Sequence, residues 1–466
     1  MTQRYFCLHG HFYQPPREDP FTGQMPREPE AAPDHDFNEK ITRECYRPNA
    51  ELDNFELISF NIGPTLSKWL LEKFPTTFEA IVRSCQKHVQ RYNVCNALAQ
   101  PVHHTILPLA RRRDKVAQVR WGIASFEHRL GCQSHGMWLP EMAVDYDTLD
   151  VLAAHGIRFT ILSEEQVSGD ISQGPGPYRV QLDRGRSIAV FVRHRMLSNQ
   201  ISFDLDQYPN AMDWIHHSAL AGIRDEFVLL ATDGETFGHH HRGAEHFLRD
   251  LLCRDLPRAG YTVTTLERYL NEHPPKIKVD VVENSSWSCV HGVARWLTGC
   301  ECTPGSSHWK GALRRALDIR ADEIDRLYVS VARDCIADPW PLRDAYIDVK
   351  LGKLDGPAFL AAHDLGHLTS ADQRRLLLML EAEFYRQRMF ASCAFFFEEL
   401  VRFEPRYAIA NAARAVALTK EATGDDLSDG FRRDLSVVVS GRLGVTGTEL
   451  YDAIMASAQA SSLTQQ

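Results

Sequence analysis

Several features are scarce or absent in this 466-residue sequence. No stretch approaches the roughly 18 to 20 apolar residues that a membrane span needs. The start of the chain, from Met1 to Cys7, lacks the apolar core and cleavage site of a signal peptide. With 52 Lys and Arg against 61 Asp and Glu, the net charge is −9, which is unfavourable for binding nucleic acid or an anionic membrane. We therefore expect no nucleic-acid partner and no membrane partner. The sequence is silent on oligomeric state.

Cysteine is also sparse. The 11 cysteines are an odd number, and most stand singly in apolar runs, as Cys253 does in Leu251-Leu252-Cys253. This usage is typical of a reducing compartment and not of a disulfide scaffold. We therefore expect a cytoplasmic protein.

Short apolar runs alternate with longer helix-like stretches over the first 270 residues. Such alternation predicts a mainly parallel sheet. The lack of a glycine-rich nucleotide-binding fingerprint favours a closed or nearly closed barrel over a doubly wound sheet. The expected fold class is α/β, a seven-stranded (β/α) barrel whose strands are 5–9, 57–61, 93–98, 135–139, 159–162, 188–193 and 227–232. A hairpin turning at Arg184-Gly185-Arg186 interrupts the alternation.

The composition changes near residue 274. Pro274-Pro275 marks a boundary, and from about residue 311 the chain has the pattern of helices, with apolar residues at helical spacing in 370–386 and 389–401. We expect a barrel domain at 1–274 and a mostly helical C-terminal domain at 275–466.

Polar side chains follow the expected strands. Functional groups of parallel barrels lie at the carboxyl ends of the strands, so their convergence there indicates an enzyme. The polar clusters are His9, His11 and Gln14; Asn61; Gln100, His103 and His104; Glu141; and Asp233 and Glu235.

Two of these residues suit acid/base chemistry. Pro140 turns the chain just before Glu141, and Asp233 follows an apolar run beside which desolvation would raise its pKa. Glycosidic chemistry needs one ionised and one protonated carboxyl group near neutral pH. A single such carboxylate more often caps a helix or pairs with a base, but two together favour the catalytic interpretation.

Four ordered blocks resemble glycoside hydrolase family 57, whose members act on α-glucans. They are His9-Gly10-His11-Phe12-Tyr13-Gln14-Pro15, Gln100-Pro101-Val102-His103-His104-Thr105-Ile106-Leu107-Pro108, Trp138-Leu139-Pro140-Glu141, and Thr232-Asp233-Gly234-Glu235-Thr236-Phe237-Gly238-His239. The resemblance implies a retaining mechanism with Glu141 as nucleophile and Asp233 as general acid/base, on glycogen, maltodextrin or a related intracellular glucan. Water as acceptor would give hydrolysis and a sugar would give transfer, and no cofactor is required.

The resemblance also implies a set of sugar contacts. Residues expected to bind substrate are His9, His11, Tyr13, Gln14, His104, Trp138, His239, Trp287, Arg295 and Trp296. Trp287, Arg295 and Trp296 lie at the start of an uncharacterised C-terminal domain that accompanies one subgroup of the family, and they are expected to help wall the cleft, although core packing explains any one Trp as well. Tyr13 stands where the family has a second histidine. Because Tyr cannot carry positive charge near neutral pH, this difference bears on substrate preference.

Two other functions stay open from the sequence. A metal-dependent carbohydrate deacetylase uses an Asp and two His in a similar barrel. His103 and His104 cannot point the same way on a strand, and His241 and His246 miss the same-face helical spacing, so we expect no metal in the barrel. The other alternative is a carbohydrate-binding protein without catalysis.

A last motif combines thiols with imidazole. Cys289, His291, Cys300 and Cys302 fall within 14 positions and have the ligand types of structural zinc. Only one residue separates the members of each pair, where zinc knuckles usually have two. A structural zinc site is one interpretation, and a packed cluster of reduced thiols is the other.

Overall fold

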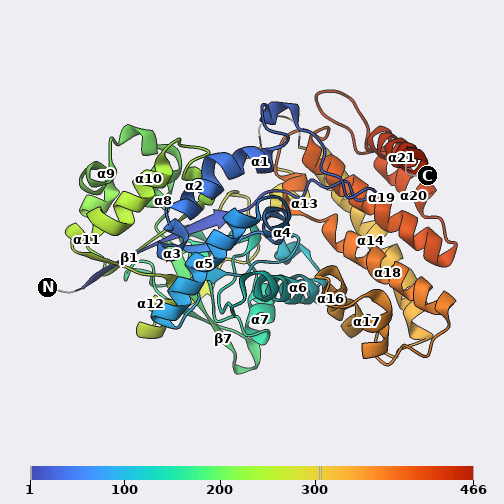
Figure 1. Ribbon diagram of the computed structural model, residues 1–466, viewed down its shortest axis with the longest axis horizontal. Coiled ribbons are helices and arrows are strands. Elements are labelled where there is room, and N and C mark those ends of the chain that lie inside the picture. Colours follow the sequence, from blue (N-terminus) through green and yellow to red (C-terminus); the bar gives the residue numbers. More distant parts are fainter. Residues whose placement is uncertain (1–2, 304, 306, 465–466) are drawn as a thin grey trace. The chain divides into compact units, whose positions relative to one another are not determined.

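The computed structural model describes residues 3–303, 305 and 307–464. The chain forms two compact units, each of which draws on more than one stretch of sequence (Figure 1). The first unit comprises Met1–Gln14, Arg27–Val102 and Phe126–Trp287, and the second comprises Pro15–Pro26, His103–Ser125 and Ser288–Gln466. Across the described residues, no helix has the length and apolarity needed to span a bilayer.

A parallel sheet lies at the centre of the first unit. The long strand β1 (Arg4–Phe12) pairs with β2 (Ser59–Ile62), β8 (Phe227–Asp233) and β9 (Tyr261–Val263), and β2 pairs with β3 (Ala97–Leu98). All of these pairings are parallel. Because these strands are almost wholly buried, only their ends can present polar groups to solvent.

A second, mixed sheet completes the strands of this unit. Its order is β4 (Phe159–Ser163), β7 (Ser187–Arg193), β6 (Tyr178–Gln181), β10 (Lys278–Val281) and β5 (Val167–Ser168). The expected hairpin is confirmed as the antiparallel pair β6 and β7, whose turn contains Arg184 at φ 56° and Gly185 at φ 76°.

The single closed seven-stranded barrel is not confirmed. The described residues form two sheets, and the segment expected as a strand at 135–139 joins them only through isolated parallel bridges, Ala99 to Met137 and Gly136 to Phe159. Gly136 sits against Phe159 and Leu98 with no room for a Cβ, and Pro140 ends the segment. It is therefore too short and irregular for a continuous ladder.

Helices follow most strands of the first unit. They include α7 (Tyr146–Ala154), which is capped by the Asp145 carboxylate accepting from Thr148 N. The others are α1 (Phe37–Ile41), α2 (Arg47–Glu51), α3 (Asn54–Leu57), α4 (Pro64–Lys73), α5 (Pro75–Tyr92), α8 (Arg195–Phe203), α9 (Ala211–His217), α10 (Ala244–Asp250), α11 (Leu256–Arg258) and α12 (Leu266–Glu272), while α6 spans Arg112–Leu130.

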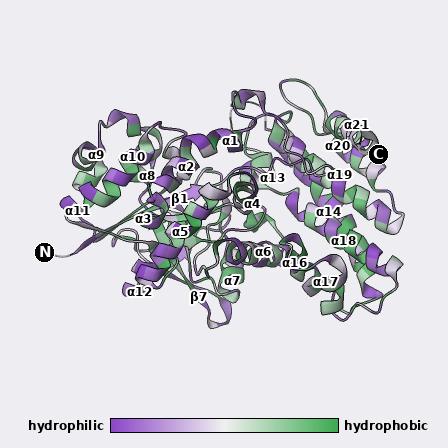
Figure 2. Cartoon of the chain, viewed as in Figure 1, coloured by the Kyte–Doolittle hydropathy of each residue, from purple (hydrophilic) through white to green (hydrophobic). Residues whose placement is uncertain are grey.

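The second unit is helical, as the sequence indicates. Long helices α14 (Trp309–Arg333), α18 (Ser370–Arg388) and α19 (Phe403–Thr423) pack on one another, and Figure 2 shows both hydrophilic and hydrophobic bands along them. The remaining helices are α13 (Ala294–Leu297), α15 (Trp340–Ala345), α16 (Ile347–Lys350), α17 (Gly356–Ala362), α20 (Ser428–Leu435) and α21 (Gly447–Thr464).

One expected helix is wrong. Segment 389–401 forms only a 3₁₀ turn, Ser392–Phe395, and irregular chain. The backbone of this segment forms hydrogen bonds with another part of the chain: Ala391 forms a β-bridge with Thr105, and Ser392 N donates to His104 O at 2.9 Å. These bonds pair the segment with 103–125 instead of continuing α18.

A buried ionic network ties the N-terminal part of α6 to the long helices of the second unit. Arg386 Nη1 lies 2.8 Å from Asp114 Oδ2 and its Nη2 lies 2.8 Å from Asp325 Oδ2. Arg343, completely buried, lies 2.9 Å from Asp114 Oδ1. Burial raises the pKa of Glu383 well above its usual range, so the network carries fewer negative charges than its carboxyl groups suggest.

Candidate active site

The strand register of the first unit gathers polar residues at one end of the parallel sheet. His11 on β1 lies opposite Asn61 on β2 and opposite Asp233 on β8. The carboxyl ends of parallel strands share one edge, so these groups converge although they are far apart in the sequence.

Two histidines of β1 and an asparagine of β2 form a neutral polar cluster. His9 Nε2 lies 3.0 Å from Asn61 Oδ1, and Asn61 Nδ2 donates to Gln100 Oε1 at 2.6 Å. His9 and His11 both stack on Trp138, with ring centroids 4.9 and 4.7 Å away. Burial lowers the pKa of His9 to about 3 and that of His11 to about 4. Both imidazoles are therefore uncharged near neutral pH.

Glu141 has an unusual backbone. Its φ of 57° and ψ of 20° lie in the left-handed region, and Met142 follows at φ 49°. A non-glycine residue pays a steric cost there, and such strain concentrates at functional sites. Two bonds hold the turn: Trp287 N donates to Glu141 O at 3.1 Å, and Trp287 Nε1 donates to Glu141 Oε2 at 3.2 Å. The carboxylate is thereby oriented by an indole that also packs edge-on against Trp138, 5.3 Å between centroids.

Asp233 ends β8 and is the exposed residue of that otherwise buried strand. Its side chain reaches solvent, but the protein atoms around it remove part of its hydration. This desolvation, together with the negative charge of Glu141, raises the pKa of Asp233 to about 7, while the charge of Arg193 opposes the rise. Asp233 can therefore hold a proton near neutral pH, and the charge of Glu141 helps to keep that proton in place.

Arg193 is a site residue that the sequence did not indicate. It ends β7, is buried, and donates through Nε to Ser163 Oγ at 3.2 Å and through Nη1 to Ala231 O at 3.3 Å. Its guanidinium lies over the Trp287 ring, 4.8 Å from the centroid. The sequence feature that could have indicated Arg193 is its position as the single charged residue at the end of the apolar run 188–193.

Glu235, two residues after Asp233, is a buried carboxyl group. Tyr46 Oη donates to Glu235 Oε1 at 2.6 Å, Tyr13 N donates to the same oxygen at 3.3 Å, and Gln14 Nε2 lies 3.5 Å from it. Burial raises the pKa of Glu235 to about 8. The group thus holds the backbone N–H of Tyr13 and the side chain of Gln14. Its partner Tyr46 was not indicated by the sequence.

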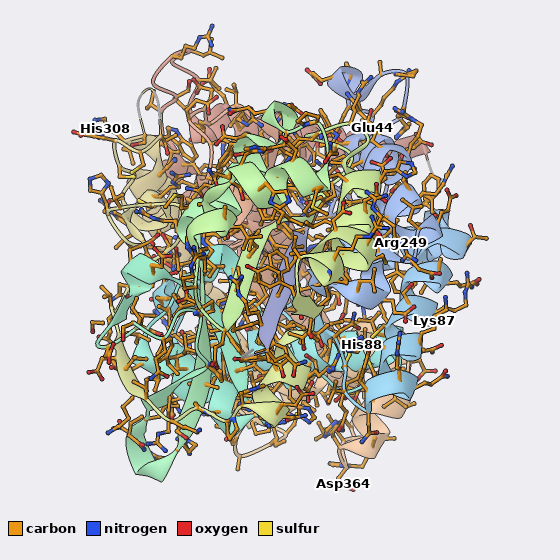
Figure 3. The ribbon with its side chains drawn as sticks, turned by 90° about the vertical axis from the view of Figure 1, so that its left-hand side faces the viewer. Glu44, Lys87, His88, Arg249, His308 and Asp364 are labelled. Atoms are coloured by element: carbon orange, nitrogen blue, oxygen red, sulfur yellow. The ribbon has the colours of Figure 1, made fainter. Side chains whose placement is uncertain are left out.

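The other expected sugar contacts divide between the two units. In the first unit, His239 is half-buried, and its Nδ1 lies 2.7 Å from Glu44 Oε2 (Glu44 is labelled in Figure 3). His104, Arg295 and Trp296 belong to the second unit. There His104 Nδ1 lies 2.6 Å from Ser392 Oγ, Arg295 Nη2 donates to Ser288 O at 2.8 Å, and Trp296 is completely buried.

Metal-ligating groups cluster elsewhere. Among the described residues, the sets of three or more His, Cys, Asp or Glu with ligand atoms close enough for one ion are Cys289, His291, Cys300 and Cys302, and Cys85, Cys95 and Cys132. Neither set includes a residue from the ends of β1, β2 or β8.

A carboxyl group protonated near neutral pH and a second carboxyl group held by the N–H of an indole that packs on another indole define a site of the carbohydrate-active class. The sequence model of "Glycosyl hydrolase family 57" matches residues 9–281, and that of a domain of unknown function, DUF3536, matches residues 306–464. The chain belongs to glycosyl hydrolase family 57.

One sequence relative and two solved structures resemble the chain. A 4-alpha-glucanotransferase of Thermococcus kodakarensis is 26% identical over 207 residues, which are 43% of this chain and 30% of that protein. The chain thus matches less than a third of that relative's length. An exo-type maltose-forming amylase from Pyrococcus sp. ST04 shares the fold with a TM-score of 0.74 and 14% identity, covering 93% of this chain and 82% of the other. A branching enzyme from Thermococcus kodakaraensis gives a TM-score of 0.57 and 15% identity, covering 98% and 94%.

Proposed function

We propose that this protein cleaves or transfers α-glucosidic bonds with retention of anomeric configuration, using Glu141 and Asp233. The observation that carries the proposal is the electrostatic pairing of these two carboxyl groups: the charge of Glu141 helps to keep Asp233 protonated up to about pH 7. The names of the relatives, a glucanotransferase, an amylase and a branching enzyme, support an α-glucan as substrate.

In the first step, the Glu141 carboxylate attacks the anomeric carbon. Asp233 gives its proton to the glycosidic oxygen, so the leaving sugar departs as a neutral alcohol and a glycosyl ester forms on Glu141. The negative charge that appears on Asp233 lies within the field of Arg193, which favours the ionised form.

In the second step, Asp233 acts as general base. It takes a proton from water or from a sugar hydroxyl, which attacks the anomeric carbon and breaks the ester, so Glu141 returns as a carboxylate and Asp233 is protonated again. A retaining enzyme requires the two carboxyl groups about 5–5.5 Å apart.

Direct contact with the sugar is assigned to exposed or half-buried groups, Tyr13, His239 and Trp287. His9 and Trp138 are completely buried, so we assign them a supporting role under His11. Neutral imidazole accepts and donates hydrogen bonds, which suits sugar hydroxyls better than it suits an anion.

The test is incubation with maltoheptaose and separation of products by chain length. We expect shorter products for hydrolysis and longer products as well for transfer, and loss of both in Glu141→Gln. The matched control is Glu283→Gln, a carboxylate whose side chain bonds Tyr146 N at 3.1 Å, which should keep full activity.

Chemical rescue with azide identifies the roles on an activated α-glucoside. Glu141→Ala should yield the β-glucosyl azide by direct displacement, and Asp233→Ala should yield the α-glucosyl azide by attack on the ester. Interchanged products would reverse the assignment. Glucan binding without turnover in the parent protein would favour a binding protein. Release of acetate from an acetylated glycan, lost to a chelator, would favour the deacetylase.

A further inference from the structure

Four ligand side chains of the second unit meet at one point. Cys289 Sγ lies 3.4 Å from Cys300 Sγ and 3.8 Å from Cys302 Sγ, and Cys302 Sγ lies 3.3 Å from His291 Nδ1. All four ligand atoms lie within 4.8 Å of one another. Nothing in the proposed glycosidic chemistry uses them.

These distances fit a tetrahedral ion. Zinc with Zn–S bonds of about 2.3 Å sets two sulfur ligands about 3.8 Å apart, and a nitrogen ligand slightly closer to each sulfur. Three thiolates and one imidazole are also the donor set that selects zinc over the harder magnesium and calcium. We propose that Cys289, His291, Cys300 and Cys302 bind a structural Zn²⁺ ion.

A buried cation stands beside the cluster. Lys310 is completely buried; its Nζ donates to Thr303 Oγ1 at 3.2 Å and to Phe396 O at 3.4 Å, and it interacts electrostatically with Cys289 and Cys300. Three thiolates around Zn²⁺ carry a net charge of −1, which a neighbouring ammonium offsets. Glu398 already interacts favourably with this ammonium, and an anionic zinc site would add to that stabilisation of a buried charge.

The surrounding chain explains why an ion is useful here. Between residues 288 and 308 the described chain forms only the short helix α13, and Val290 at the tip of the first turn is 91% exposed. Such a segment has little regular backbone hydrogen bonding to hold it, and a metal that links Cys289 and His291 to Cys300 and Cys302 closes it into a fixed loop. With four protein ligands the ion has no open position, which makes its role structural and not catalytic.

The second thiol cluster serves as the internal comparison. Cys85, Cys95 and Cys132 lie 3.0–3.7 Å apart, but no fourth His, Cys, Asp or Glu of the described residues joins them. All 11 cysteines are free thiols. Replacing one cysteine of each cluster therefore shows which of the two clusters holds the metal.

The experiment measures zinc by mass spectrometry in the full-length protein, produced with zinc in the medium and washed with a weak chelator. We expect about one zinc per chain, lost to near zero in Cys302→Ser and in His291→Ala. His308→Ala and Cys132→Ser are the controls and should keep their zinc. His308 is exposed at the start of α14 (Figure 3).

Two results overturn the proposal: a parent protein without zinc, or zinc that is lost in Cys132→Ser and kept in Cys302→Ser. Because a substituted chain could fail to fold, X-ray absorption of the unaltered protein gives an independent answer. Three sulfur neighbours and one nitrogen neighbour are expected, and any other set contradicts the assignment. Neither measurement depends on glycosidic activity.

Discussion

Replacing Arg193 with Met should move the pH dependence of activity upward. With a pKa of about 7, Asp233 is about nine tenths protonated at pH 6 and about one tenth protonated at pH 8, so kcat/KM should fall roughly tenfold between them. The positive charge of Arg193 favours the ionised form of Asp233 and so lowers its pKa. Removing that charge raises the pKa, and the falling limb of the profile should lie at higher pH.

The assay is the pH profile of kcat/KM for maltoheptaose, which reports the free enzyme. Arg195→Met is the matched control, because Arg195 is exposed, lies two residues away and changes the net charge equally. The falling limb of the Arg195→Met profile should lie at the same pH as that of the parent protein. A parent profile that is flat from pH 6 to 8, or a limb that moves to lower pH in Arg193→Met, would refute the assignment of the protonated group to Asp233.

The remaining predictions concern stability and positioning. Arg386→Met takes one arginine from each of two buried aspartates, while Asp114 keeps Arg343 and Asp325 keeps Arg111 and Arg113. The loss of these charged hydrogen bonds should cost about 1.5–3 kcal/mol of unfolding free energy in urea. Arg374→Met, on the same helix with a side chain 75% exposed, should cost well under 1 kcal/mol, and equal losses would contradict the burial argument. Both Glu141→Gly and Glu141→Ala should be inactive, but the glycine variant should be more stable by about 1–2 kcal/mol because glycine adopts φ near 57° without strain, and thermal unfolding checks the order. Tyr46→Phe removes the buried 2.6 Å bond to Glu235 and should cost about 1–3 kcal/mol together with part of kcat/KM; an unchanged KM and kcat would mean that Glu235 does not position the site.

Much of the site could be predicted from residue order. His11, Asn61, Glu141 and Asp233 were expected at strand ends. A polar residue that directly follows an apolar run can be recognised from the sequence alone. Arg193 also stands at such an end, but a single arginine at the end of a strand is common and does not by itself indicate a site.

Other features depend on three-dimensional packing and left no pattern. The left-handed backbone at Glu141 is imposed by bonds to Trp287, 146 residues later. Tyr46 becomes a site residue only because it reaches Glu235 across 189 residues. Segment 389–401 has helical spacing, yet its backbone bonds to 104–105 outweigh that propensity.

The divided composition of the second unit has a consequence for synthesis on the ribosome. Its segments 15–26 and 103–125 are made early, and the rest, from residue 288, is made last. At about 5–20 residues per second, roughly 20–70 s separate the synthesis of residue 125 from that of residue 464. For about the first two thirds of that time Trp121 lacks the Asp344 carbonyl that it later bonds at 2.8 Å, and Asp114 lacks both Arg343 and Arg386. The growing chain therefore displays a charge-rich helix whose Trp121 is still uncovered, and a gene cut at residue 287 would leave these groups without their partners permanently.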